Sequence, residues 1–407
     1  MEKQKCPEIR FSQFKEAWFE TTLGDVVDIV GGGTPDTNVP EFWNGEIDWY
    51  SPTEIGNSVY ANGSVKTITK LGLKNSSAKI LPAKRTVLFS SRAGIGDMAI
   101  LNKDAATNQG FQSFIANNID VYFLYSMGFK IKKFALSKAS GSTFLEISRN
   151  QLAQMEFLAP SIDSDEQKHI GQFFQHLDQS IALHEKKLAQ TQNFKKAMLE
   201  KMFPKQGSKR PEIRLKGFSG DWEKKKLENE VEFFSGLTYS PNDITDKNGT
   251  LVLRSSNVHD NQIVTENNVY VDNEAINVQN VEVGDIIVVV RNGSRNLIGK
   301  HAVINEKMEN TVIGAFMTGV KASNPYFINA LFDTNLFDVA VSRNLGATIN
   351  QITTGMFKEM EFSFPNEDEQ IAIGQFFQKI DETCLLLKQQ LQTLKNLKQA
   401  FLEKMFV

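Results

Sequence analysis

The sequence has few cysteines, few histidines and no long apolar run, and each shortage excludes a class of protein. Its 407 residues contain two cysteines, Cys6 and Cys384, and five scattered histidines. Such a set can neither form a disulfide framework nor supply a metal site, so we expect a reducing compartment and no bound metal. No window approaches ~18 consecutive apolar residues, and the first residues lack the apolar run of a signal peptide. We therefore expect a cytoplasmic protein with no membrane partner.

Catalytic motifs are missing as well. The sequence has no Walker lysine motif, no helicase motif and no Gly-x-Ser-x-Gly. Its Asn-Pro-Tyr at 324–326 lacks the second proline of an adenine-methylase site. The formal net charge of -3 gives no general basic character, which counts against sequence-independent binding of nucleic acid. We predict a non-catalytic chain in which any site for a polyanion is local, and the missing motifs disfavour an autonomous nuclease or methylase.

What the sequence does contain is an internal repeat. The hexapeptide IGQFFQ occurs at 170–175 and again at 373–378, within segments 165–203 and 368–406 that share 20 of 39 residues. The segments that open the two halves, called the PEIR entries below, also match: PEIRF at 7–11 and PEIRL at 211–215. Between these anchors the halves diverge almost beyond alignment. Each half is therefore a variable block followed by a constant segment.

The constant segments have the pattern of long helices with one apolar face. Apolar residues recur at alternating spacings of four and three, each segment opens with acidic residues, and neither contains a proline. An ordinary core helix is one interpretation of such a stripe. A long helix with one apolar stripe needs a partner, however, and the other copy supplies it. We predict an antiparallel coiled coil, in which Cys384 is a small buried hydrophobic residue. The predicted interface residues are Ile170, Phe174, Leu177, Ile181, Leu188, Met198, Ile373, Phe377, Ile380, Leu387, Leu391, Leu394 and Phe401.

The variable blocks contain short apolar runs broken by Gly, Asn and Ser, which predict strands joined by loops. In both blocks a strand-loop-strand pattern carries an arginine just after the first strand, Arg92 in block one and Arg291 in block two. Exposed loops are common places for binding residues. GGGTP at 31–35 is not followed by Gly-Lys-Ser/Thr, so it predicts a turn rather than a phosphate cradle.

Together these patterns predict a mixed α+β fold with two globular blocks, two long helices and an internal pseudo-twofold repeat. The predicted domains are 1–160 (block one), 161–205 (central long helix and linker), 206–364 (block two) and 365–407 (C-terminal long helix).

Local charge points to a polyanion. Residues 62–92 carry several lysines and arginines but no acidic residue, and lysines bind phosphates without reading sequence. Arginines in block two stand among amides, as in the stretch 342–351, and Arg with Asn or Gln is the set that recognises base edges. A solvated face and ordinary turn residues are the alternatives. The candidates for phosphate contact are Lys66, Lys70, Lys74, Lys79, Lys84 and Arg85. The candidates for base contact are Arg92, Arg254, Arg291, Asn292, Arg295, Arg343 and Asn344.

These motifs carry a family resemblance over essentially all 407 residues. The PEIR entries, the DEQ..IGQFFQ helices that end in LEKMF, and the opening GGGTP....FWNGEIDWY of block one resemble the specificity subunit of a type I restriction-modification system. Block two departs from that opening, with SGLTYSPND at 235–243. The resemblance implies that each block is a target-recognition domain for one half of a split, asymmetric site in double-stranded DNA.

The resemblance also implies partners. Two methylation (M) subunits would bring S-adenosylmethionine and flip an adenine, and two restriction/translocase (R) subunits would use ATP and Mg for cleavage. No cofactor would bind this chain. The alternative from another class is a coiled-coil adaptor whose blocks bind proteins. The two hypotheses differ in salt dependence and sequence preference of DNA binding.

Overall fold

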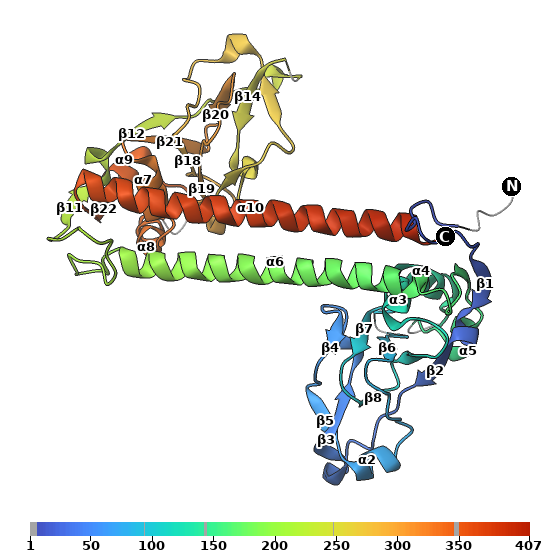
Figure 1. Cartoon of the computed structure of the whole chain (residues 1–407). Helices are drawn as coiled ribbons and strands as arrows, with labels where there is room; N and C mark the ends of the chain where they lie inside the picture. Colours follow the sequence, from blue (N-terminus) through green and yellow to red (C-terminus); the bar gives the residue numbers. More distant parts are fainter. Residues whose placement is uncertain (1–5, 93, 142–144, 247, 346–349) are drawn as a thin grey trace. The chain divides into compact units, whose positions relative to one another are not determined.

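The computed structural model describes residues 6–92, 94–141, 145–246, 248–345 and 350–407 (Figure 1). The chain forms two compact units. Unit 1 contains Met1–Glu185 and Gln389–Val407, and unit 2 contains Lys186–Lys388. Each unit therefore holds one variable block together with a part of each constant segment.

The constant segments form two long helices, α6 (Glu166–Met202) and α10 (Glu367–Met405). Their ends lie within a residue of the ends of the repeated segments, so the predicted helices are confirmed. Among the described residues, no helix has both the length and the apolar character needed to cross a membrane.

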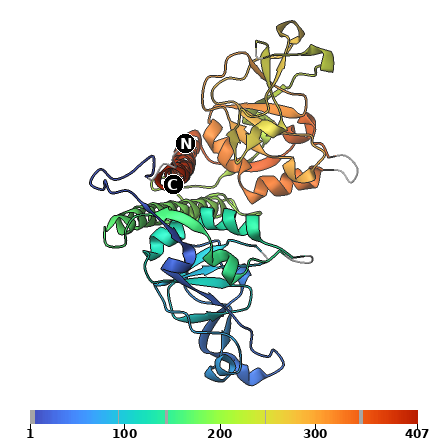
Figure 2. The same cartoon turned by 90° about the vertical axis from the view of Figure 1, so that its right-hand side faces the viewer.

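Unit 1 carries two main sheets and several short helices. Its strands are β1 (Phe19–Thr22), β2 (Val27–Gly31), β3 (Trp43–Tyr50), β4 (Tyr60–Ala61), β5 (Lys66–Ile68), β6 (Thr86–Phe89), β7 (Met98–Leu101), β8 (Ala105–Thr107), β9 (Gln112–Ala116) and β10 (Glu156–Ala159). Its short helices are α1 (Leu23–Val26), α2 (Lys70–Lys74), α3 (Val121–Ser126), α4 (Gly128–Lys138) and α5 (Arg149–Ala153). The sheet orders are β2-β9-β6-β7-β4 and β5-β3-β8, and β1 pairs with β10. In Figure 2, helices α3 and α4 (teal) lie between α6 (green) and the strands of the unit.

Unit 2 has a related set of elements. Its strands are β11 (Glu223–Lys226), β12 (Val231–Ser235), β13 (Ile244–Thr245), β14 (Thr250–Leu253), β15 (Val258–His259), β16 (Gln262–Ile263), β17 (Val269–Val271), β18 (Ile286–Val289), β19 (His301–Val303), β20 (Thr311–Ile313), β21 (Met317–Ala322) and β22 (Glu361–Phe364). Its short helices are α7 (Pro325–Phe332), α8 (Asn335–Asn344) and α9 (Thr354–Lys358). The sheet orders are β12-β21-β18-β19 and β13-β17-β14-β20, with the pairs β11-β22 and β15-β16.

The two blocks share a frame although their sequences diverge. The order β2-β9-β6-β7 in unit 1 corresponds to β12-β21-β18-β19 in unit 2. Each second sheet contains one parallel pair, β3 with β8 and β14 with β20. The entry strand also pairs antiparallel with the strand before the long helix in both units, β1 with β10 and β11 with β22. The predicted mixed fold and internal repeat are confirmed.

In each unit, the end of one long helix packs against the start of the other. In unit 1 the ring of Phe406 lies 5.8 Å from Phe174 of α6 and 5.1 Å from Phe123 of α3, measured between centroids. All three side chains belong to one apolar core. Trp18 joins this core, with its ring 6.0 Å from Phe123.

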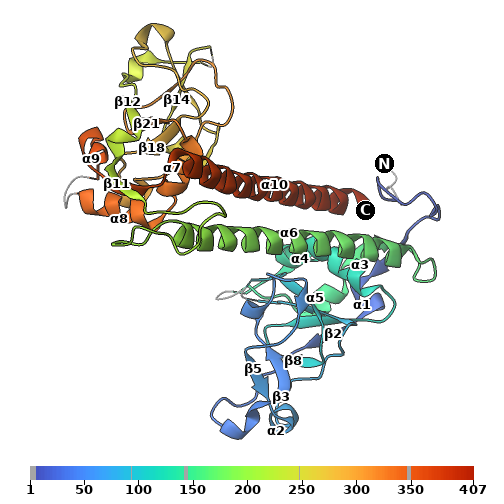
Figure 3. The same ribbon diagram turned by 60° about the vertical axis from the view of Figure 1, so that its left-hand side comes forward.

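Unit 2 has the same kind of socket, an apolar pocket that receives a phenylalanine, but the two long helices exchange their roles. The ring of Phe203, just beyond α6, lies 6.1 Å from Phe377 of α10 and 5.6 Å from Phe327 of α7. Trp222 packs 6.1 Å from Phe327. Figure 3 shows α7 beside the first turns of α10. In each unit, the IGQFFQ of one copy of the repeat therefore packs against the LEKMF of the other copy.

The helices are antiparallel inside each unit. In unit 1, Phe173 contacts Phe401 and Glu185 pairs with Lys395, so the residue number rises along α6 while it falls along α10. The same order holds in unit 2, where Lys195 pairs with Asp381 and Phe203 contacts Phe377. The predicted orientation is confirmed.

The glycine of IGQFFQ allows a short helix to approach the long one. A Cβ on Gly171 would collide with Asp120, whose carboxylate caps α3, and a Cβ on Gly374 would lie 2.8 Å from the amide nitrogen of Phe327 in α7. Any larger residue at these positions would push the short helix away. The repeated glycines thus have the same packing role in both units.

A buried ion pair ties each PEIR entry to the first turn of a long helix. The guanidinium of Arg10 donates two hydrogen bonds to Glu166, at 2.6 and 2.7 Å, and the Glu166 side chain is 1% exposed. In unit 2, Arg214 donates to Glu369 at 2.7 and 2.6 Å. Bidentate pairs of this kind are strong and orientation-specific. These pairs explain why the arginine of PEIR and the glutamate of DEQ occur in both copies of the repeat.

Polar residues in the helix seam specify the orientation of the helices. Asp178 pairs with Lys398 in unit 1 at 2.5 Å, and Asp381 pairs with Lys195 in unit 2 at 2.5 Å. Because the repeat offset is 203 residues, parallel packing in the same register would place the two aspartates together and the two lysines together. Such like-charge contacts disfavour the alternative packing.

The structure buries or half-buries all of the predicted interface residues. Ile170, Phe174, Ile373, Phe377 and Ile380 are buried in the cores of their own units. The remainder are half-buried: Leu177, Ile181, Leu188, Met198, Leu387, Leu391, Leu394 and Phe401. Cys384 is also half-buried against the core of unit 2, and burial raises the pKa of its thiol, which suits a packing residue better than a nucleophile.

We expect Arg10→Ala to destabilise unit 1 by about 3 kcal/mol, because it leaves the buried carboxylate of Glu166 without its partner. Urea unfolding followed by circular dichroism measures this change. Lys70→Ala in the same unit breaks an ion pair whose partners are 83% and 67% exposed, and it should change the unfolding free energy little. Equal effects of the two variants would contradict the assigned role of Arg10.

Charge reversal tests the seam. Lys398→Asp should destabilise unit 1 by at least ~2 kcal/mol, because it places a second carboxylate beside Asp178, whose side chain is only 9% exposed. Adding Asp178→Lys should recover part of that loss, as a double-mutant cycle would show. The control is Lys395→Asp, which faces the half-exposed Glu185 and should cost less than ~1 kcal/mol. A double variant no more stable than Lys398→Asp would contradict a specific pairing.

Candidate nucleic-acid interface

The arginine loops predicted in the two blocks occupy equivalent places. Arg92 follows the central strand β6 and forms an antiparallel backbone bridge with Glu146, whereas Arg291 follows β18 and bridges with Gln351. Glu146 and Gln351 are 205 residues apart, which is also the offset between MEFLAP at 155–160 and MEFSFP at 360–365. Each arginine therefore starts a loop that the frame holds at the same position of its sheet.

In unit 1, three segments meet around Arg92. Its guanidinium donates to the carbonyl of Gln109 at 2.8 Å and lies 3.9 Å from the carboxylate of Glu146. The side chain of Gln109 accepts a hydrogen bond from the hydroxyl of Thr34, which belongs to GGGTP. The Arg92 side chain remains about one third exposed. The result is a polar surface built from the Arg92 loop, the GGGTP segment and the loop after β8.

GGGTP is a close-approach segment and not the predicted turn: Gly31 ends β2, residues 32–35 form no turn, and a turn follows only at Thr37–Asn38. A Cβ on Gly32 would collide with the backbone at the end of β8, and one on Gly33 would collide with Ser77 and Ala78. Gly236, the counterpart of Gly32 in the repeat, meets the backbone of Gly314 after β20 in the same way. The glycines thus let the segment that follows β2 or β12 pass beside the second sheet.

In unit 2, the Arg291 loop meets an exposed aromatic ring. The guanidinium of Arg291 lies 5.0 Å from the centroid of Phe316, and Phe316 is 51% exposed. Asn292 donates to the hydroxyl of Ser255 at 3.0 Å, which joins this loop to the segment after β14. Arg254 lies in that segment and donates to the carbonyl of Asn267 at 2.9 Å. Arg254, Arg291 and Asn292 are therefore neighbours in the fold.

The other candidates of block two lie farther along the chain. Arg295 donates to the carbonyl of Leu345 at 3.4 Å, which brings it beside the end of α8. Arg343 is exposed in the last turn of α8, whereas the amide of Asn344 donates to the carbonyl of Ala340 within that helix. The stretch 342–351 also includes residues 346–349, which lie outside the described part of the chain.

All candidates for phosphate contact are exposed, but they do not form one surface. Lys66 lies on β5, Lys70 and Lys74 lie on α2, and Lys79 follows this helix. Lys84 and Arg85 precede β6, and Arg85 donates to the carbonyl of Ala116 at 3.2 Å.

The strand β6 separates these residues from Arg92. Arg85 and Arg92 lie at opposite ends of β6, seven residues apart, or roughly 23 Å along an extended chain. The run of basic residues at 62–92 is therefore divided between different parts of unit 1.

The sequence did not indicate several residues of these surfaces. Gln109, Ser255 and Phe316 contact the arginine loops, and Thr34 contacts Gln109, but each stands outside the basic runs. Only Phe316 has a signal in the sequence, and a weak one, since it is a bulky apolar residue in the turn between β20 and β21. Among the described residues, no group of three or more His, Cys, Asp or Glu could hold a metal ion.

Comparison with known families decides what this architecture belongs to. A model of the type I restriction modification DNA specificity domain matches residues 15–193 and again residues 219–396. The chain belongs to this family. It carries two copies of the specificity domain, as the internal repeat predicted, and the resemblance stated from the sequence is confirmed. The family implies no catalytic cofactor on this chain.

Similar proteins agree with this assignment. The chain is 32% identical over 188 residues to the type I restriction enzyme MjaIX specificity subunit of Methanocaldococcus jannaschii, a match that spans 45% of this chain and 42% of that protein. It is 22% identical over 402 residues to the MjaVIII specificity subunit of the same organism, which covers 94% of this chain and 91% of that protein. These relatives are named specificity subunits, which agrees with the predicted non-catalytic role.

The fold is also similar to a solved structure. The crystal structure of the type I restriction-modification S subunit from M. genitalium matches with a TM-score of 0.66 and 14% sequence identity, and the match covers 99% of both chains. At this identity the comparison supports the fold, including the two long helices and the repeated blocks.

Proposed function

We propose that this chain is the DNA-reading specificity subunit of a type I restriction-modification complex, in which each block reads one half of a bipartite, asymmetric target. The observation that carries the proposal is the combination of one frame with two different loop sets. Arg92 and Arg291 follow equivalent strands, but their neighbours differ: Gln109 and Glu146 in unit 1, Phe316 in unit 2. Equivalent frames with dissimilar loops suit two dissimilar half-sites.

The chemistry of the loops supports base contact there. Arg can donate two hydrogen bonds to guanine, and Asn can pair with adenine, in the major groove. The exposed lysines around β5 and α2 supply charge for phosphates, which position the protein without specifying sequence. Lys70 already has Glu46 as a neighbour, but both side chains are mostly exposed, so water and salt weaken that pair.

The proposed division of labour follows the segments of the chain. Segments 1–160 and 206–364 are the target-recognition domains, and 161–205 and 365–407 supply the helices that set the distance between half-sites. Two M subunits with S-adenosylmethionine and two R subunits with ATP and Mg would complete the complex. The MjaIX relative is matched over less than half its length, so these partners belong to the proposal.

Mapping the modified adenines tests the function directly. When the chain is expressed with its M subunit, sequencing of modified bases should return one motif with two defined parts and an unspecified gap. DNA affinity of the complex should also fall steeply with salt, because phosphate contacts release counterions. An adaptor that binds only proteins would give no such motif and no sequence preference, and either result would contradict the proposal.

Single arginine variants should separate the two half-sites. We expect Arg92→Ala to relax one half of the motif and Arg291→Ala to relax the other, each by about fivefold to 150-fold in discrimination, as expected for loss of a paired base contact worth about 1–3 kcal/mol. Competition binding with half-site variants of the DNA measures this loss.

Lys74→Ala is the matched control for these arginine variants. It should weaken binding to all sequences alike and reduce the salt slope by about 1, while every letter of the motif stays unchanged. If Arg92→Ala behaves like Lys74→Ala, Arg92 contacts phosphate and is not a base-reading residue.

A further inference from the structure

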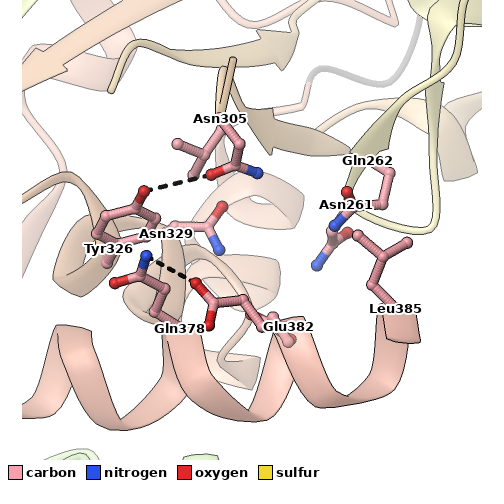
Figure 4. A pocket seen from close by; sticks show the side chains of 10 residues that line it. Asn261, Gln262, Asn305, Tyr326, Asn329, Gln378, Glu382 and Leu385 are labelled. Atoms are coloured by element: carbon pink, nitrogen blue, oxygen red, sulfur yellow. Dashed lines mark hydrogen bonds between the residues drawn. The ribbon is translucent and has the colours of Figure 1, made fainter. Parts of the chain in front are cut away.

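Unit 2 contains a polar cavity that the proposed DNA-reading role does not use. It has a volume of about 190 Å³ and lies between α10, α7 and the turn of the β15-β16 hairpin. Figure 4 shows Asn329 of α7 in its middle, with Tyr326 and Asn305 on one side and Asn261 and Gln262 on the other. Helix α10 contributes Gln378, Asp381, Glu382 and Leu385.

One buried polar atom in this cavity has no partner. The Asn329 side chain is 8% exposed and lines the cavity, and its Oδ1 forms no hydrogen bond with the described residues. Buried polar groups are normally hydrogen-bonded, so an orphan acceptor requires an explanation. The neighbouring amides do not donate to it: Asn261 donates to Asp333 and Gln378 donates to Glu382.

The equivalent place in unit 1 is filled by the chain itself. Phe123 approaches Gly171 as Phe327 approaches Gly374, so Tyr125 of α3 is the counterpart of Asn329. Tyr125 packs against Tyr122 at 5.6 Å between ring centroids. Tyr122 in turn packs against Tyr60 at 6.4 Å.

These tyrosines also satisfy the polar groups of α6. Tyr122 donates its hydroxyl to Asp178 at 2.9 Å, and Gln175 donates to the hydroxyl of Tyr60 at 2.8 Å. In unit 2, Tyr326 instead turns its hydroxyl to Asn305, so Asp381 lacks the phenol donor that Asp178 has. Unit 2 thus leaves open a space in which unit 1 places aromatic rings and a hydrogen-bond donor.

The lining of the cavity favours a planar cation. Asp381 and Glu382 are acidic, and no lysine or arginine is among the lining residues that the structure describes. Burial raises the pKa of Asp381, and the ammonium of Lys195 opposes that shift. Tyr326 offers a ring on which a guanidinium can stack, and the carboxylates and Asn329 Oδ1 accept its N–H groups.

The mouth of the cavity points to a protein as the source of this cation. Leu385 lines the cavity and is 37% exposed, and the next residue of α10, Leu386, is 53% exposed. Arginine is enriched in the cores of protein–protein interfaces, and a protein that presents an arginine here would also cover these two leucines. We propose that this cavity binds the guanidinium of an arginine side chain presented by a partner protein. The proposal does not depend on DNA reading by the loops.

Saturation-transfer NMR on the full chain tests the proposal with small probes. Nα-acetyl-arginine amide imitates an arginine within a protein, and its side-chain protons should receive magnetisation from the chain. The citrulline analogue has the same shape without the charge, and its signal should be at least fivefold weaker. Equal signals from arginine and citrulline analogues, or from arginine and lysine analogues, would overturn guanidinium recognition. Binding of free arginine without binding of the blocked form would overturn a protein source.

Variants localise the signal. Glu382→Gln changes an exposed residue and should weaken the arginine signal at least threefold without affecting the fold. Glu403→Gln is the matched control, because Gln399 donates to Glu403 on the same helix as Gln378 does to Glu382, and the signal should not change. Asn329→Tyr imitates unit 1 and should abolish the signal, with the unfolding midpoint as the check on folding. A signal retained in Glu382→Gln, or lost in Glu403→Gln, would place the binding elsewhere.

Discussion

Each unit depends on the contact between the end of one long helix and the start of the other. Phe406 fills the socket around Phe174 and Phe123, and Phe203 fills the one around Phe377 and Phe327. Without these contacts, the block of each unit would retain only its own strands and short helices around an incomplete apolar core. Because the two sides of a socket come from different copies of the repeat, neither half of the chain completes a unit by itself. The constant segments are alike for this reason: each must serve as an opening helix in one unit and as a closing helix in the other.

The same constraint explains which residues repeat and which do not. Glu166 and Glu369 hold the entry arginines, Gly171 and Gly374 admit the short helices, and all four are buried where a substitution would disturb several elements. The loops after β6 and β18 take part in none of these four contacts. They can therefore differ in length and chemistry while the sheet order beneath them remains the same. A frame shared by both units, with independent loops, is the physical basis on which the proposed two specificities would rest.

The sequence predicted what is periodic or repeated, and it missed what depends on distant contacts. The seam spacing predicted the long helices, the need of each helix for a partner predicted their antiparallel pairing, and the strand-loop-strand pattern predicted the corresponding places of Arg92 and Arg291. The partner of Glu166 was not predicted, because Arg10 lies 156 residues away and no local pattern connects them. Similarly, the run of basic residues at 62–92 does not reveal that β6 separates Arg85 from Arg92. A run of basic residues shows only that positive charge is present, whereas the course of a strand through the fold decides which charges share a surface.

Divergence within the frame is as informative as its repetition. Position for position, Tyr125 in unit 1 corresponds to Asn329 in unit 2, and the change removes an aromatic ring from beside an aspartate of the seam. A loop can change freely because solvent satisfies its polar groups, but a buried position changes only when something else compensates. Near Asp381, the ion pair with Lys195 supplies part of that compensation. The amide of Asn329 receives none from the described residues. The asymmetry between the two units therefore lies not only in the arginine loops but also in the frame, at a position beside the seam.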